Sequence, residues 1–321
     1  MHDFSAAALR LAEIEGLRIE PDAPLSRYTR FGLGGPASLL VDVAREKSLN
    51  CAIARLESDG LPYVIIGGGS NLVVNDAGYA GVVLRYTASC VCLKDGLVHA
   101  EAGADLQALV DFSIDNGLSG IHTMTGIPGW VGGAIYGNAG AYGRSTHENV
   151  KSVRFFDGSG IRAFANADCG FKYRHSRFKD NKRWIILSSL WELKAGDATA
   201  LRKQADEILA IRNAKYPPDM KCAGSIFKNL LFAELPTSVQ STVDPKVIRE
   251  GKVPSAYFLE QVGAKGIRNG DIHVADYHAN LIYNAGHGTA KQVREIVNDL
   301  KARVRSKFGF DVEEEVQYVG F

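Results

Sequence analysis

The chain has 321 residues, of which 46% are hydrophobic and 23% charged, and its formal net charge at pH 7 is +1. This composition is that of a globular protein and excludes a disordered chain, while the small net charge argues against a nucleic-acid coat or a membrane-surface protein. The length favours two or three domains over a single hydrophobic core.

The five cysteines and the N-terminal sequence indicate the cellular compartment in which the protein is expected to work. The cysteines are odd in number and form no Cys-x-x-Cys pair, so neither a disulfide framework nor a zinc site is expected. No apolar run reaches membrane-spanning length, and the N-terminal MHDFSAAALRLAEIEG has acids and a helical rhythm in place of an export signal. These features predict a cytoplasmic protein with no metal, membrane or nucleic-acid partner.

Predicted helices and strands alternate along most of the chain. In chain order the first are a helix over 45–59 that ends at Gly60, a strand over 63–66, the segment GGGSN at 67–71 and an apolar run at 72–74. An amphipathic helix follows over 105–116, with its apolar residues on one side and Gly117 as its stop.

The segment 126–143 reads GIPGWVGGAIYGNAGAYG and holds seven glycines in eighteen residues. It is too apolar and aromatic for a flexible linker, so an ordered, close-packed loop is expected. Strands over 152–156 and 184–193 and a helix over 198–213 come next.

The last third ends on clear signals. Thr289 and Gln292 have the spacing of a capping box, and apolar residues then recur at helical spacing up to Gly309. A final strand is expected over 310–319. Strand alternation places Glu314 on its apolar face and Glu315 opposite, although a solvated acidic edge is the plainer interpretation.

The two glycine-rich segments suggest a ligand. In GGGSN, consecutive glycine amides can turn inward on a phosphate, but a tight structural turn fits equally, and neither a Rossmann fingerprint nor a P-loop is present. Together with 126–143, the pattern favours a large planar ligand with a pyrophosphate, such as a flavin dinucleotide. A glycine-rich domain interface is the alternative.

Two further residues are chemical candidates. Arg174 lies beside a tyrosine in a basic stretch, 151–183, and a guanidinium there suits an oxyanion, although surface ion pairing is the common role of such residues. Ser225 follows Gly224 with a lysine nearby, so it suits a nucleophile, an acid or a phosphate ligand. The absence of a G-x-S-x-G elbow weakens a hydrolase interpretation.

Taken together, these segments resemble the UDP-N-acetylenolpyruvoylglucosamine reductases. Seven pieces occur in the family's order over roughly residues 25–320, and no single one would be convincing alone. They are Arg30–Pro36 (RFGLGGP), Gly67–Asn71 (GGGSN), Thr125–Gly133 (TGIPGWVGG), Asn138–Gly143 (NAGAYG), Tyr173-Arg174, Ala223–Asn229 (AGSIFKN) and His278–Asn280 (HAN).

The resemblance implies an α/β (α+β) fold. It has a two-subdomain FAD-binding region of the vanillyl-alcohol-oxidase type and a C-terminal α+β substrate-binding domain. The expected boundaries are 1–86, 87–197 and 198–321. The implied activity is reduction of UDP-N-acetylglucosamine enolpyruvate to UDP-N-acetylmuramate by NADPH through FAD, in peptidoglycan synthesis.

The resemblance also implies residue roles. Arg174 steadies the enolate, Ser225 donates a proton, and Glu315 is the third catalytic residue. Tyr173, Lys215, Lys228 and Asn229 are implied substrate ligands. The implied FAD ligands are Gly67, Gly68, Gly69, Ser70, Asn71, Thr125, Gly126, Pro128, Gly129, Gly132, Gly133, Asn138, Gly140, Ala141 and Tyr142.

The chain departs from the family pattern in places. Leu230 stands where Pro usually follows Asn229, Glu314 replaces a Pro, and Ala275-Asp276-Tyr277 replaces the commoner Ser-x-Lys. The alignment selects Glu315 where alternation points to Glu314, and the alignment is followed. The short gap from Arg174 to Ser225 is that of the subgroup without the Tyr-bearing substrate lid.

Further expectations concern the cofactor and the assembly. FAD is expected to be held noncovalently, because no His or Cys lies within the two glycine-rich segments, and a monomer is expected. Two alternatives remain: another FAD enzyme acting on an alcohol or sugar acid, and a non-catalytic flavin-binding module.

Overall fold

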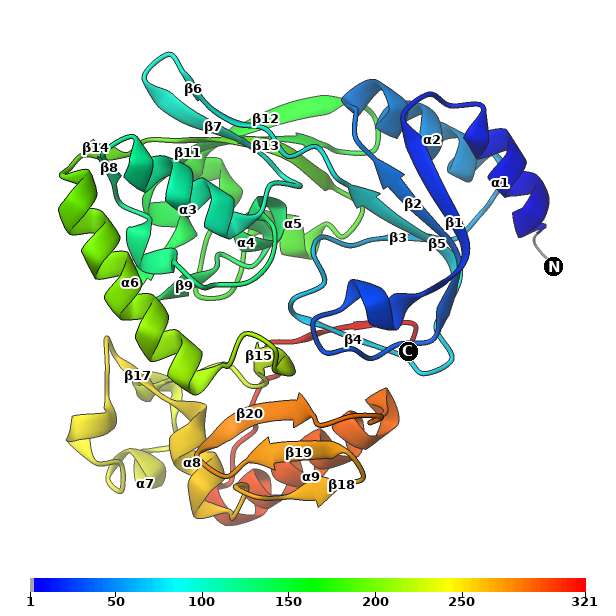
Figure 1. Ribbon diagram of the computed structural model, residues 1–321. Coiled ribbons are helices and arrows are strands. Elements are labelled where there is room, and N and C mark those ends of the chain that lie inside the picture. The colour runs from blue at the N-terminus through cyan, green and yellow to red at the C-terminus, as the bar shows by residue number, and fades with distance from the viewer. Residues whose placement is uncertain (1–2) are drawn as a thin grey trace. The chain divides into compact units, whose positions relative to one another are not determined.

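The computed structural model describes residues 3–321, so the first two residues of the N-terminal stretch lie outside it. The chain forms two compact units, each assembled from separate segments (Figure 1). Unit 1 comprises residues 3–23, 37–69 and 79–214, and unit 2 comprises 24–36, 70–78 and 215–321. The boundaries 1–86, 87–197 and 198–321 stay a prediction.

The first sheet of unit 1 has the strand order β1-β2-β5-β3. β2, β5 and β3 are parallel, and helix α2 connects β2 to β3, as a crossover between parallel strands requires. Helices α1 and α2 lie beside this sheet (Figure 1), and their apolar residues share one core with it. The bounds are α1 Phe4–Ala12, β1 Leu17–Pro24, β2 Pro36–Val43, α2 Glu46–Ser58, β3 Tyr63–Ile65 and β5 Tyr79–Tyr86.

The second sheet of unit 1 is antiparallel, in the order β12-β11-β13-β7-β6. Phe155, Phe164, Phe178 and Trp184 form an aromatic cluster on it, with ring centroids 4.6–6.3 Å apart. Its strands are β6 Val91–Lys94, β7 Leu97–Glu101, β11 Val150–Phe156, β12 Ile161–Ala165 and β13 Ile185–Trp191.

Helices complete unit 1. Arg202 of α6 forms ion pairs with Asp111 and Asp115 of α3, which ties the two helices together. The helices are α3 Leu106–Asp115, α4 Val131–Tyr136, α5 Arg177–Asp180 and α6 Ala198–Lys215, with 3-10 turns η2 His122–Met124, η3 Thr146–Glu148 and η4 Asn166–Cys169. The short strands are β8 Leu118–Ser119, β9 Gly140–Ala141, β10 Arg144–Ser145 and β14 Lys194–Ala195.

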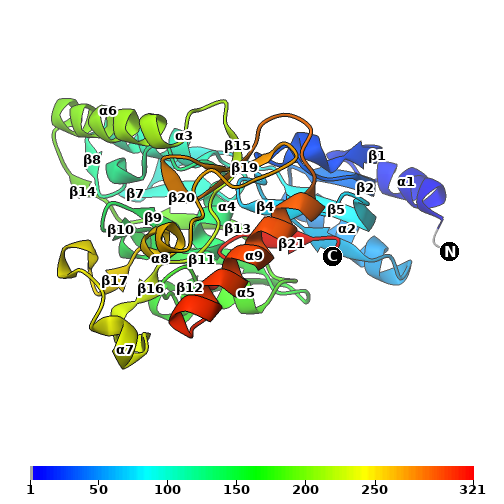
Figure 2. The same ribbon diagram turned by 90° about the horizontal axis from the view of Figure 1, so that it is seen from below.

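Unit 2 contains an antiparallel sheet in the order β15-β20-β19-β18, with helix α9 packed on one face (Figures 1 and 2). The capping box of Thr289 and Gln292 begins α9, and the Asp76 carboxylate accepts hydrogen bonds from two of its first amides. The main elements are β15 Lys221–Ser225, β18 Arg268–Asn269, β19 Ile272–Ala275, β20 His278–Asn284, α8 Ser255–Gln261 and α9 Ala290–Phe308. Smaller ones are η1 Leu25–Tyr28, β4 Leu72–Val74, β16 Leu230–Leu231, η5 Phe232–Glu234, α7 Thr237–Gln240, η6 Pro245–Val247, β17 Lys252–Val253 and β21 Gln317–Val319.

Most predicted elements are confirmed, but two differ. The final strand is much shorter than the predicted 310–319: only β21 pairs, parallel to β4, while Phe227 and Glu314 form an isolated bridge. The segment 126–143 is ordered but includes the helix α4, because Trp130–Tyr136 can bury Val131, Ala134 and Ile135 on one side. Among residues 3–321, no helix has the length and apolarity needed to cross a membrane.

Candidate active site

The two glycine-rich segments meet in unit 1 through Trp130. A Cβ on Gly68 would lie 2.9 Å from Cδ1 of the Trp130 ring, so only glycine permits this contact. On the same indole, the Arg85 guanidinium lies 5.4 Å from the ring centroid. Arg85 is itself held by two hydrogen bonds to the buried Asp42, at 2.6 and 2.7 Å. Trp130 is therefore fixed next to the turn that GGGSN begins.

Hydrogen bonds also fix the second segment. Gln107 of α3 accepts from the Gly126 amide at 2.7 Å and from the Thr125 hydroxyl at 3.2 Å. The Gly132 amide donates to the Ala102 carbonyl at 2.8 Å. These bonds hold the segment in one conformation, as a binding loop requires.

The geometry at two glycines fits a closely approaching ligand. A Cβ on the exposed Gly133 would meet no atom within 4 Å, and a Cβ on Gly67 would meet only Trp130, at 4.0 Å. The chain's own packing therefore does not require glycine at either position. A flat ligand lying against the backbone would require it, because any Cβ would keep the ligand at a distance. These residues fit a flavin dinucleotide.

Other predicted FAD ligands have structural roles of their own. Asn138, with φ of 43°, donates from its amide to the Lys172 carbonyl at 2.9 Å and accepts from the His147 amide at 3.0 Å. Tyr142 also has a positive φ, 53°, and its side chain is exposed. Gly69, Gly126 and Gly129 have φ of 67°, 71° and 112°, where glycine is favoured.

Arg174 lies in a tight turn of unit 1 that is joined to this loop. Its Nη2 donates to the Gly140 carbonyl at 2.9 Å, and its guanidinium lies 5.2 Å from the ring centroid of Tyr173. Its φ is 53°, a left-handed conformation that costs a non-glycine residue on the order of 1 kcal/mol. The structure thus places two predicted substrate and catalytic residues beside predicted FAD ligands.

The rest of the basic stretch 151–183 is partly accounted for by surface ion pairs. Lys151 pairs with Glu192, Arg154 with Glu46, and Arg162 with Asp157. Their positive charge is therefore largely balanced within the protein.

Ser225 ends strand β15 in unit 2, just after an irregularity in its pairing. Cys222 pairs with Tyr283 and Ser225 with Leu281, so β15 contains an extra residue, and Gly224 adopts φ of 76° there. Such a bulge turns the following side chain in a new direction. The Ser225 hydroxyl lies 3.1 Å from the Tyr216 hydroxyl.

The backbone after Ser225 lies between two other segments of unit 2. The buried Asn280 side chain accepts from the Phe227 amide and donates to its carbonyl, each at 2.8 Å. On the opposite side, the Glu315 amide donates to the Ile226 carbonyl at 2.7 Å. The side-chain amide of Asn71 donates to the Glu315 carbonyl at 3.0 Å. The structure therefore brings Ser225, Glu315 and Asn71 into one part of unit 2.

The implied substrate ligands of unit 2 differ in their surroundings. The Lys228 ammonium is hydrogen-bonded to the Glu313 carboxylate, and only 16% of the Lys228 side chain is exposed. Asn229 is exposed next to it. The Lys215 ammonium lies 5.1 Å from the ring centroid of Tyr216.

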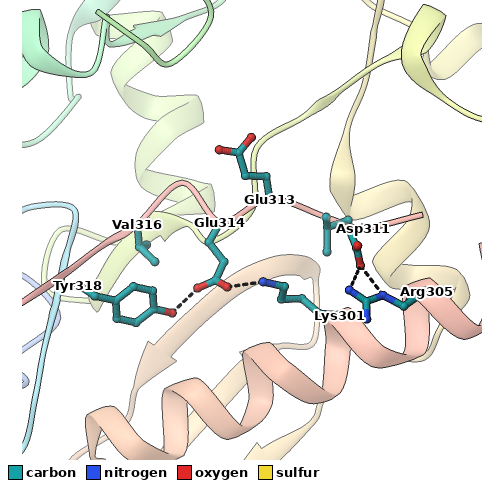
Figure 3. Close-up of a pocket in the computed structure, with 8 residues that line it drawn as sticks. Lys301, Arg305, Asp311, Glu313, Glu314, Val316 and Tyr318 are labelled. Carbon is teal, nitrogen blue, oxygen red and sulfur yellow. Dashed lines mark hydrogen bonds and ion pairs between the residues drawn. The ribbon is translucent and has the colours of Figure 1, made fainter. Parts of the chain in front are cut away.

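Glu314 is the residue that replaces the family's usual proline. Figure 3 shows its carboxylate between two partners: it accepts from the Lys301 ammonium at 2.8 Å and from the Tyr318 hydroxyl. Burial together with this bond raises the pKa of Tyr318 well above its usual range. The strand on which alternation placed Glu314 does not form at this position, and the Glu314 carboxylate is used within the fold.

Sequence reasoning missed one residue at this site. Tyr216 was assigned no role, although it directly follows Lys215 in the run Lys-Tyr-Pro-Pro. No periodicity or motif indicates which hydroxyl a tyrosine in such a run will contact. Asn280 lies within the His-Ala-Asn motif, but its bonds to Phe227 were likewise not expected.

Comparison with known proteins gives family matches over most of the chain. Residues 214–319 match the family described as UDP-N-acetylenolpyruvoylglucosamine reductase, C-terminal domain, and residues 37–163 match the family described as FAD binding domain. A UDP-N-acetylenolpyruvoylglucosamine reductase from Solibacter usitatus (strain Ellin6076) is 54% identical over 312 residues, which cover 97% of this chain and 100% of the relative. One from Geotalea uraniireducens (strain Rf4) is 34% identical, covering 92% of each chain.

A solved structure is similar over nearly its whole length. The crystal structure of UDP-N-acetylenolpyruvylglucosamine reductase from Thermus caldophilus matches with a TM-score of 0.73 and 28% sequence identity. The match covers 94% of this chain and 98% of that one.

Proposed function

Because the chain belongs to the family of UDP-N-acetylenolpyruvoylglucosamine reductases, we propose that Arg174, Ser225 and Glu315 are its catalytic residues. The chain is an FAD-dependent oxidoreductase that reduces UDP-N-acetylglucosamine enolpyruvate with NADPH in peptidoglycan synthesis. The observation that carries the activity is the 54% identity over 97% of the chain.

The FAD ligands come from the two glycine-rich segments. The residues of these segments would hold FAD, which would supply the hydride-transfer chemistry between NADPH and C3 of the enolpyruvyl group. The open backbone at Gly67 and Gly133 and the fixed Trp130 support this placement. Because neither segment contains His or Cys, attachment is noncovalent.

Arg174 stabilises negative charge on the substrate. When C3 accepts hydride, charge develops toward the carboxylate as an enolate, and a fixed guanidinium lowers the energy of that charge. The bond to the Gly140 carbonyl and the stacking on Tyr173 support this role, because they limit the movement of the guanidinium. Glu315 assists at the same stage when its carboxyl carries a proton or otherwise donates a hydrogen bond.

Ser225 completes the reaction by donating a proton to C2. The bulge at Gly224 fixes the direction of its side chain, and the backbone bond from Glu315 to Ile226 joins two of the proposed catalytic segments. Lys215, Lys228, Asn229 and Tyr173 hold the substrate.

Three narrower proposals follow from the family resemblance and the composition. The chain belongs to the subgroup without the Tyr-bearing lid, because only 50 residues separate Arg174 from Ser225. It works in the cytoplasm, which agrees with its unpaired cysteines. It acts as a monomer.

The experiment that tests the activity is anaerobic spectroscopy of the purified protein. The flavin spectrum should bleach when NADPH is added and return only when UDP-N-acetylglucosamine enolpyruvate is added. Bleaching without return would overturn the substrate assignment, and a protein that takes up no FAD would overturn the activity.

The substitution Ser225→Ala tests the proton donor. NADPH should still reduce the flavin at the wild-type rate, while reoxidation by the substrate should slow by about 10²–10⁴-fold, the usual loss for a placed acid. Stopped-flow absorbance resolves the two half-reactions. Ser58→Ala, at an exposed serine of α2, is the matched control and should change neither rate. Reoxidation at the wild-type rate in Ser225→Ala would remove Ser225 from the mechanism.

A further inference from the structure

A serine hydroxyl is a weak acid, so a serine that donates a proton needs a second group behind it. Lys228 is the nearest cation in sequence, but its ammonium is hydrogen-bonded to Glu313. The Tyr216 hydroxyl does contact Ser225, at 3.1 Å from Oγ. A phenol is also the stronger acid of the two, with an ordinary pKa of about 10.

The Tyr216 ring is held in place by its surroundings in unit 2. It packs against a small buried cluster of Cys222, Ala275 and Leu281. The His278 ring lies 6.2 Å away between centroids, at an interplanar angle of 50°. The phenol therefore points its hydroxyl at Ser225 from a fixed position, and its ring does not depend on that hydrogen bond for packing.

The charges near Tyr216 suit a phenol that gives up a proton. The Lys215 ammonium lies 5.1 Å from the centroid of the ring, where a cation stabilises negative charge on the phenol. The neighbouring His278 is no competing proton source, because burial first, and then Lys215 and Lys265, lower its pKa to about 4. Near pH 7 it is neutral.

We infer that Tyr216 is a positioning residue that orients the Ser225 hydroxyl and resupplies the proton that Ser225 delivers to C2 of the substrate. This inference rests on the proposed role of Ser225. The C2–H bond forms as the Oγ–H bond of Ser225 breaks, and the electron pair of the broken Oγ–H bond stays on Oγ. The Tyr216 O–H bond then breaks toward Oγ, and water reprotonates the phenolate.

The test is the substitution Tyr216→Phe, which keeps the ring and removes only the hydroxyl. NADPH should reduce the flavin at the wild-type rate, while the rate of reoxidation at saturating substrate should fall roughly 10–100-fold. The substrate concentration giving half-maximal rate should stay unchanged, because Tyr216 acts through Ser225 and not on binding. Tyr283→Phe is the matched control, since that tyrosine packs on the same cluster but its hydroxyl faces His273 at 3.4 Å. It should leave both half-reactions unchanged.

A double variant separates this inference from the proposed function. If Tyr216 acts through Ser225, Ser225→Ala with Tyr216→Phe should be no slower than Ser225→Ala alone. If the decreases in reoxidation rate of the two single variants multiply in the double variant, Tyr216 and Ser225 act independently, and the inference is overturned. Wild-type reoxidation in Tyr216→Phe, with slow reoxidation in Ser225→Ala, would overturn the inference and leave the proposed function intact. Wild-type reoxidation in Ser225→Ala would overturn the role of Ser225 itself.

Discussion

At the scale of single residues, Arg174 and Ser225 share a feature: in each case the backbone at or just before the residue adopts a positive φ. Arg174 itself has φ of 53°, and Gly224, just before Ser225, has φ of 76°. Backbone in this region directs side chains along paths that regular strands and helices do not allow. Both candidates are thus aimed by local geometry, which supports roles that need a fixed direction.

The lowered pKa of His278 leads to a prediction of how the stability of the protein depends on pH. Its folded pKa is lowered to about 4, against about 6.5 for an unfolded histidine. Below pH 6.5 the unfolded chain therefore binds a proton that the folded chain does not, and stability falls as pH falls toward 4. Between pH 7.5 and 5.5 this group alone should lower the free energy of unfolding by about 1 kcal/mol.

Urea denaturation at the two pH values measures this effect. In the variant His278→Asn, the decrease in the free energy of unfolding between pH 7.5 and 5.5 should be smaller by about 1 kcal/mol. The variant His287→Asn, at an exposed histidine, should show the wild-type decrease. An equal decrease in wild type and His278→Asn would show that His278 does not titrate in this way.

At the scale of elements, helix propensity and ligand binding make opposite demands on one position of helix α4. Gly133 lies within it, and a Cβ there would contact no protein atom. Gly133→Ala should stabilise the FAD-free protein by up to about 1 kcal/mol, because alanine is the better helix former. It should also weaken FAD binding about 10- to 100-fold, because a methyl group placed in a packed contact costs about 1–3 kcal/mol.

Chemical denaturation of the FAD-free protein and fluorescence titration with FAD measure these two opposite changes. Gly160→Ala is the control, because a Cβ at that turn also meets no atom within 4 Å, yet it lies outside both glycine-rich segments. It should leave FAD affinity unchanged. Unaltered FAD affinity in Gly133→Ala would remove α4 from the cofactor site.

At the scale of the whole molecule, cofactor removal should lower thermal stability. A ligand that binds only the folded protein stabilises it by about 2.7 kcal/mol at a free concentration one hundred times its Kd. Differential scanning calorimetry of the FAD-free protein should therefore show a Tm that rises with added FAD. FMN should have a smaller effect, because it lacks the adenylate half. Equal stabilisation by FMN would contradict binding of the dinucleotide as a whole.

The local patterns that the sequence expresses clearly were predicted correctly. The apolar spacing and stop glycines of α2, α3 and α9 gave those helices nearly to the residue, and the capping box of Thr289 and Gln292 is present. These signals depend on neighbours three or four residues apart, so the chain needs no tertiary partner to show them. The family motifs are local in the same sense, and they indicated the fold, the cofactor and the activity, all of which the comparisons confirm.

Only the tertiary structure decided which residues far apart in the sequence contact each other. Residues 24–36 and 70–78 belong to unit 2, the Asn71 side chain contacts Glu315 across 244 positions, and β21 pairs with β4. The pairing of Tyr216 with Ser225 depends on the bulge in β15. The physical reason is that such bonds form only when packing of the apolar cores brings distant segments together, and no local spacing in the sequence records which segments will meet.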